Sequence, residues 1–129
     1  MPGTTENRTN ELSDISRALK YLAKEVSAPV IVLSQLNRLV EQRPNKRPRM
    51  SDLKDSGAIE QDADLIFMLY RDYTYSKDED WKNVVEVKLV KHRNGPTKDL
   101  LLSFRDELTR FGDLAPEIMN SYAENRTAD

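Results

Sequence analysis

Two short apolar runs constrain the fold of this chain more than any other feature of its sequence. Residues 30–33 are Val-Ile-Val-Leu, and residues 65–69 are Leu-Ile-Phe-Met-Leu. Apolar runs of this length, without alternation, are typical of strands that are buried on both faces, as in a parallel sheet. We therefore predict one strand at residues 30–33 and a second at residues 64–70.

The second half of the chain predicts an antiparallel hairpin. Apolar and charged residues alternate over residues 84–91, as expected for a third strand. Residues 94–96 are Asn-Gly-Pro, a strong turn signal, because Asn and Gly tolerate positive φ and Pro prevents a helix from following directly. A fourth strand at residues 99–104 would complete the hairpin, and residues 108–111 are a candidate for a short edge strand.

Only one long helix is predicted, over residues 11–26, with a short helical turn near residue 52 and another at residues 58–63. Within residues 11–26, apolar residues recur at three- and four-residue steps, which predicts one buried stripe: Leu12, Ile15, Leu19, Leu22 and Val26. A sheet with two strands that are apolar on both faces needs helices on both sides. One long helix and two short helical turns cannot cover both faces of such a sheet. The chain is therefore either part of a larger α/β domain or an obligate component of an assembly.

Composition excludes several classes of function. The 129 residues leave room for one domain, and we expect it at residues 11–112, between a flexible leader at 1–10 and a polar tail at 113–129. Cysteine is absent and His92 is the only histidine, so we expect no metal site and no histidine-based triad. No membrane span or signal peptide is predicted, and a cytoplasmic location fits.

A basic loop stands out from a chain whose net charge is -2. Residues 38–51 contain one anion, Glu41, and five cations: Arg38, Arg43, Lys46, Arg47 and Arg49. Pro44 and Pro48 favour an extended path. A basic loop on an acidic body suits contact with a polyanion, although a solvated charge run is an alternative for any one of these cations.

A second cationic feature closes the third predicted strand. Lys91 and Arg93 are two residues apart, so their side chains should point to the same side of that strand. Such a pair at the rim of a sheet suits a phosphate or a carboxylate, and a solvated hairpin end is the alternative. The sequence contains no Gly-x-x-x-x-Gly-Lys-Ser/Thr loop, so the pair would be only part of a phosphate site.

Four segments together resemble the final motifs of the DnaB-type replicative DNA helicases. They are Ser-Gln-Leu-Asn-Arg at residues 34–38, Lys-Arg-Pro at 46–48, Ser-Asp-Leu-Lys-Asp-Ser-Gly-Ala-Ile-Glu-Gln-Asp-Ala-Asp at 51–64, and Lys-His-Arg-Asn-Gly-Pro at 91–96. Their order and spacing match the family from about residue 11 to about residue 111. The part of the third segment that begins at Ser56 is nearly diagnostic by itself.

The resemblance implies a partial RecA-like fold of the α/β class, in which parallel strands continue into an antiparallel C-terminal hairpin with few helices. Residues 11–112 would be the C-terminal portion of an ATPase domain that lacks its P-loop half. The family assembles as a hexameric ring on single-stranded DNA and unwinds duplex DNA by ATP-driven translocation. ATP and Mg²⁺ would be bound mainly by upstream residues, and neither is expected to bind this chain alone.

The implied partners are single-stranded DNA, the other subunits of the ring, the upstream P-loop half, primase and the helicase loader. The implied location is the cytoplasm of a bacterial or phage-infected cell, or an organelle. By itself the chain would lack ATPase activity.

Residue by residue, the resemblance implies three catalytic roles. Arg93 resembles the arginine finger that reaches the nucleotide of the neighbouring subunit, and Lys91 resembles a contact to the γ-phosphate. Gln35 resembles the coupling glutamine at a strand end, between the γ-phosphate and the DNA loops. His92 departs from the glutamine often found between the two cations, and we assign it no catalytic role.

The DNA-contacting loop of the family corresponds to Lys54, Asp55 and Gly57. Their main-chain N–H groups and the Lys54 ammonium would hold phosphates without reading bases. Four cations of the basic loop would add an electrostatic funnel: Arg43, Lys46, Arg47 and Arg49. A loop that merely caps a helix is the alternative for residues 54–57.

Two other functions remain open from the sequence. The chain could be a non-catalytic module that binds single-stranded nucleic acid, or a truncated relic of a RecA-like ATPase. It could also belong to another RecA-like family, such as the recombinase-related proteins, although residues 52–64 argue against that family.

Overall fold

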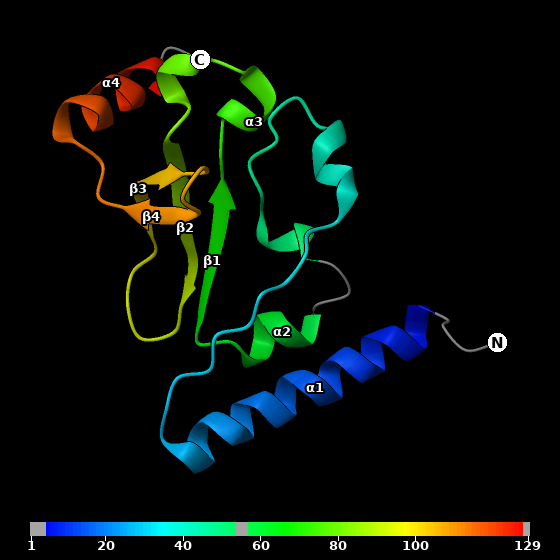
Figure 1. The fold of residues 1–129 in the computed structure, drawn as a ribbon. Coiled ribbons are helices and arrows are strands. Elements are labelled where there is room, and N and C mark those ends of the chain that lie inside the picture. The colour runs from blue at the N-terminus through cyan, green and yellow to red at the C-terminus, as the bar shows by residue number, and fades with distance from the viewer. Residues whose placement is uncertain (1–4, 54–56, 128–129) are drawn as a thin grey trace. The chain divides into compact units, whose positions relative to one another are not determined.

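The computed structural model describes residues 5–53 and 57–127. Figure 1 shows the course of the chain through helices, strands and short 3₁₀ helices. Two compact units are present: the first contains the described residues up to Ile66 together with Val90–Gly95, and the second contains Phe67–Leu89 and the described residues from Pro96 onward. None of the helices in the described part is both long and apolar enough to cross a membrane.

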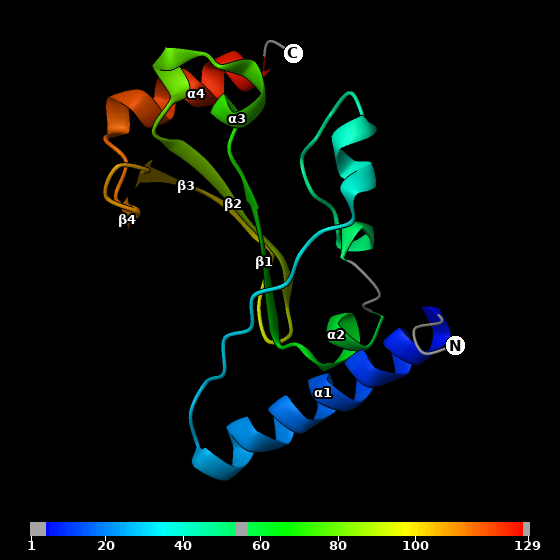
Figure 2. The same cartoon turned by 45° about the vertical axis from the view of Figure 1, so that its right-hand side comes forward.

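Helices α1 (Thr5–Val26) and α2 (Gly57–Asp62) lie side by side in the first unit (Figures 1 and 2). The Ser16 hydroxyl donates to Asp62 Oδ2 at 2.9 Å, and Lys20 Nζ donates to the Asp62 carbonyl at 2.9 Å. Ser27, in the left-handed conformation at φ 51°, ends α1, and its N–H donates to the Lys24 carbonyl. The predicted helix and its end are therefore confirmed.

Two details of that prediction are wrong. Helix α1 begins at Thr5, so residues 5–10 belong to the helix and not to a leader, because no Gly or Pro interrupts them. The predicted stripe is not fully buried, since Ile15, Leu22 and Val26 remain exposed. The short helix α2 is too small to cover the whole length of α1.

The predicted strand at residues 30–33 does not form. These residues have no regular structure, and Ile31 and Leu33 are 87% and 94% exposed. A strand owes its stability to hydrogen bonds with a neighbouring strand. The β-type pairing that follows this segment among the described residues is an isolated bridge between Leu36 and Leu53, outside the sheet. The prediction of a parallel arrangement fails for the same reason.

The sheet contains four strands in the order β1-β2-β3-β4. Strand β1 (Leu65–Tyr70) forms as predicted but is covered on one face only, since Ile66 and Met68 are buried while the residues between and beside them are exposed. Strand β2 (Val84–His92) pairs with β3 (Lys98–Arg105) as the predicted antiparallel hairpin, and β3 pairs antiparallel with the short edge strand β4 (Arg110–Gly112).

The core of the second unit involves a helix that the sequence did not predict. The short helices α3 (Tyr73–Ser76) and η3 (Glu79–Trp81) precede β2, and helix α4 (Pro116–Thr127) follows β4. The buried core residues are Val84, Leu114 and Tyr122, with Trp81 and Leu101 packed against them. The predicted polar tail thus contains a helix, α4, and its Tyr122 is buried.

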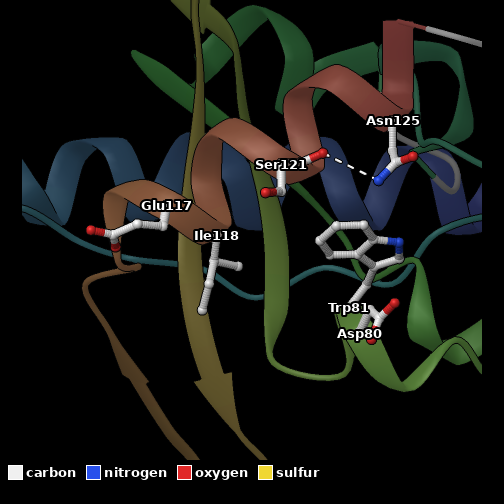
Figure 3. A pocket seen from close by; sticks show the side chains of 6 residues that line it. All are labelled: Asp80, Trp81, Glu117, Ile118, Ser121 and Asn125. Carbon is white, nitrogen blue, oxygen red and sulfur yellow. Dashed lines mark hydrogen bonds between the residues drawn. The ribbon is translucent and has the colours of Figure 1, made fainter.

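Tyr122 explains why α4 packs in this place. Its ring meets the Trp81 ring edge-on, with centroids 5.2 Å apart, and its hydroxyl donates to the buried carboxylate of Glu86. Figure 3 shows Trp81 beneath α4, in a shallow hollow that is also lined by Ser121 and Asn125. One aromatic residue thus supplies both apolar contact and the partner that a buried carboxylate needs.

Candidate functional site

The cationic pair at the end of β2 converges on one end of helix α2. Arg93 Nη2 donates to the Gln61 carbonyl at 2.9 Å, and Lys91 Nζ donates to the same carbonyl at 3.3 Å. Lys91 Nζ also donates to the Glu60 carbonyl. The last carbonyls of a helix lack partners within the helix and carry partial negative charge, so they attract cations. The predicted common orientation of the two side chains is confirmed.

Arg93 has a second anchor just beyond α2, at Asp64. Its backbone N–H donates to the Asp64 carbonyl at 3.0 Å, and its Nη1 lies 2.9 Å from Asp64 Oδ1. Lys20 of α1 approaches the same Oδ1 at 3.4 Å. The Arg93 guanidinium is thus oriented by a carboxylate and a carbonyl while its side chain keeps 41% of its surface exposed.

The turn after the pair forms where it was predicted, for a different reason. The Gly95 N–H donates to the His92 carbonyl at 3.3 Å, which closes a β-turn. Neither Asn94 nor Gly95 has a positive φ. A Cβ on Gly95 would overlap the His92 ring. Glycine at this position leaves room for the His92 imidazole, which packs against the turn.

Part of the basic loop is held together by a partly buried ion pair. The Arg43 guanidinium contacts both carboxylate oxygens of Asp52, at 2.6 and 2.7 Å, and the Arg49 N–H donates to Oδ2 at 2.7 Å. Arg43 Nη2 also donates to the Arg47 carbonyl at 2.9 Å. The hydrogen bonds from Arg43 lower the pKa of Asp52, against the opposing effect of its burial, and raise the pKa of Arg43.

These contacts change the interpretation of Arg43. Its guanidinium holds the loop together, and the predicted contact of Arg43 with DNA stays a prediction. No local pattern in the sequence predicts its pairing with Asp52. Lys46 and Arg47 are half-buried and Arg49 is exposed, and their contact with DNA stays a prediction.

The other predicted DNA contacts lie around the start of α2. Lys54 and Asp55 are outside the described residues, and Gly57 is the first residue of α2. Apart from its chain neighbours and the backbone of α2, no described atom lies within 4 Å of the place where a Gly57 Cβ would stand. Packing among the described residues therefore does not require glycine at this position.

Gln35 does not lie at a strand end, because the strand before it is not formed. Its side chain is exposed. The two residues after it pair with the segment that leads to the predicted DNA loop: Leu36 bridges Leu53, and the Asn37 N–H donates to the Asp52 carbonyl at 2.7 Å. Gln35 is thus close in sequence to a connection with that loop, and its coupling role stays a prediction.

The donors at this site suit phosphate oxygens. Lys91 and Arg93 offer only N–H groups, which bind anions and not metal ions. Among residues 5–53 and 57–127, no group of three or more His, Cys, Asp or Glu could hold a metal ion. Charge stabilisation on a bound phosphoryl group is chemistry that such side chains are able to perform.

Comparison with known proteins decides the family. Residues 1–113 match the DnaB-like helicase C-terminal domain. The chain belongs to this family. It is 53% identical over 116 residues to the replicative DNA helicase DnaB of Pasteurella multocida, which covers 90% of this chain and 25% of that protein. It is 54% identical over 109 residues to the DnaB of Geobacillus stearothermophilus, covering 84% of this chain and 24% of that protein.

Two solved structures share the fold of this chain. One of them, an ATPase domain, superposes with a TM-score of 0.78 at 53% identity, over 84% of this chain and 38% of that one. The other, a DnaB-like replicative helicase solved in a study of its interactions with primase, gives 0.79 at 53% identity, over 84% and 26%. This DnaB-like chain thus spans about a quarter of the length of the curated relatives it matches.

Proposed function

We propose that this DnaB-like chain supplies the trans-acting cations and part of the DNA-binding surface of a hexameric replicative helicase. The observation that carries the proposal is the convergence of Lys91 and Arg93 on the Gln61 carbonyl. This carbonyl lies near the end of α2, a six-residue helix whose first residue, Gly57, belongs to the predicted DNA loop. One short helix therefore connects the two parts of the proposed site.

At the nucleotide end, Arg93 would act as the arginine finger of the neighbouring subunit's site, and Lys91 would contact the γ-phosphate. In phosphoryl transfer, catalysis is mostly positioning and stabilisation of the charge on the transferred group, which a planar guanidinium provides well. ATP and Mg²⁺ would be held mainly by the upstream, P-loop-bearing part of the assembly. The complete assembly is the enzyme, and the isolated chain would not hydrolyse ATP.

At the DNA end, Lys54, Asp55 and Gly57 would contact the phosphates of single-stranded DNA. Lys46, Arg47 and Arg49 would raise the local concentration of the strand, as basic grooves do. Gln35 would transmit the state of the γ-phosphate to this loop through the pairing of Leu36 with Leu53. The assembly would act in the cytoplasm of a bacterial or phage-infected cell, or in an organelle, together with primase and a loader.

A chimeric helicase tests this proposal. The chimera joins the upstream part of the Geobacillus stearothermophilus helicase to the complete 129-residue chain, which replaces the corresponding C-terminal portion. We expect it to hydrolyse ATP and to unwind duplex DNA, while the chain alone does neither. Hydrolysis by the chain alone would contradict the proposal. An inactive but folded, hexameric chimera would favour a non-catalytic module, and binding of the chain to single-stranded DNA without ATP would then identify its function.

Replacing Gly57 by alanine should weaken DNA binding without harming the fold. A Cβ at this position would meet no described atom within 4 Å, and alanine is the better helix former. A phosphate that approaches the main chain closely would meet the new methyl group. We expect the affinity of the chimera for an oligothymidine to fall about tenfold, roughly the effect of one lost contact, with no drop in melting temperature. Unchanged affinity would exclude close phosphate contact at Gly57.

A further inference from the structure

Asp64 lies between α2 and β1, and the resemblance to the family assigns it no role. Asp64 follows α2 by two residues and directly precedes β1. It contacts Arg93 twice, once through its main-chain carbonyl at 3.0 Å and once through Oδ1 at 2.9 Å. From the geometry, we propose that Asp64 is the positioning residue of the arginine finger. This inference rests on the proposed function of Arg93.

The two contacts fix different parts of Arg93. The main-chain bond fixes the position of the Arg93 backbone relative to the start of β1. The carboxylate and the Gln61 carbonyl then bind Nη1 and Nη2, so both ends of the guanidinium plane are anchored. A guanidinium has five N–H donors, and these two bonds leave others that can reach a phosphate. Asp64 thus orients the Arg93 guanidinium and leaves N–H groups that can donate to a phosphate.

A second cation, Lys20, shares the Asp64 carboxylate with Arg93. Its Nζ approaches Asp64 Oδ1 at 3.4 Å, so two cations share one oxygen. The side chain of Asp64 is 65% exposed, and exposed ion pairs contribute little to stability. An interaction of this kind orients a side chain more than it stabilises the fold. Loss of the carboxylate should therefore affect catalysis and leave folding intact.

The test is Asp64→Asn in the chimeric helicase. We expect kcat for ATP hydrolysis to fall about 10- to 100-fold, because a misplacement of about 1 Å at a reacting group can cost about 100-fold. The dissociation constant for a non-hydrolysable ATP analogue and the melting temperature should stay as in the parent. Asp64→Glu keeps the charge and should recover part of the lost kcat.

A matched control is available in the second unit. Asp106 lies 3.4 Å from Arg71 in another ion pair with an exposed carboxylate, and Asp106→Asn should leave kcat unchanged. In the double variant Asp64→Asn, Arg93→Ala, kcat should be no lower than in Arg93→Ala alone, because Asp64 acts through Arg93.

The outcomes separate this inference from the proposed function. If Arg93→Ala lowers kcat and Asp64→Asn does not, the positioning role is wrong and the finger remains. If Asp64→Asn lowers the melting temperature, or weakens nucleotide binding by the same factor as it lowers kcat, Asp64 is structural and the inference is wrong. If Arg93→Ala leaves kcat unchanged, the proposed function itself is wrong.

Discussion

Replacing Arg93 by alanine in the chimeric helicase will lower kcat for ATP hydrolysis about 1000-fold or more and leave ATP binding nearly unchanged. The guanidinium stabilises charge that develops on the phosphoryl group during transfer, so its loss raises the barrier and not the dissociation constant. Single-turnover hydrolysis and equilibrium binding of a non-hydrolysable ATP analogue measure the two effects separately.

The control for this prediction is Arg110→Ala, which removes an exposed arginine from β4 in the second unit. Its kcat should match that of the parent. A hexamer that contains Arg93→Ala and still hydrolyses ATP at the parental rate would show that the finger lies elsewhere. Mixing parental and variant subunits adds a further check, since a residue that acts in trans should inactivate the neighbouring subunit's site.

Replacing Asp52 by alanine will release the basic loop. The change leaves the Arg43 guanidinium and the Arg49 N–H without the carboxylate that they share. Hydrogen bonds to charged groups are among the strongest in proteins, so we expect amides of residues 37–53 to exchange about 10- to 100-fold faster with solvent. Hydrogen exchange with mass spectrometry measures this, and Asp113→Ala, at an exposed aspartate of the second unit, is the control.

The same pair predicts how the loop responds to acid. The pKa of Asp52 is lower in the folded protein than its ordinary value of 3.8, so the folded state binds fewer protons than the unfolded state. The stabilisation is fully present above that ordinary value and is lost as the pH falls through the lowered pKa. Protection of the loop amides should therefore decrease in acid, and this decrease should be absent in Asp52→Ala. Equal pH dependence in both proteins would contradict this role of the pair.

Local patterns predicted the elements whose partners are close in sequence. The hairpin of β2 and β3 follows from alternation and from a strong turn signal, and its register is set within the hairpin itself. The common direction of Lys91 and Arg93 follows from the period of a strand. The family was identified from motifs whose residues are contiguous, so no tertiary information was needed.

The contacts that were not predicted are made by side chains outside any regular pairing of strands. Arg43 pairs with Asp52 inside the irregular basic loop, and Asp64, which precedes β1, pairs with Arg93, which follows β2. Tyr122 gave no signal by itself, because the buried carboxylate that it satisfies is 36 residues away. The run at residues 30–33 predicted a strand, but whether such a run becomes one depends on a neighbouring strand.

The exposed apolar run at residues 30–33 affects how the chain associates with other chains. Its apolar side chains are exposed, and among the described residues its backbone is paired with no strand. Such a segment is a template for pairing with another strand, so we expect concentrated solutions of the isolated chain to aggregate through residues 30–33.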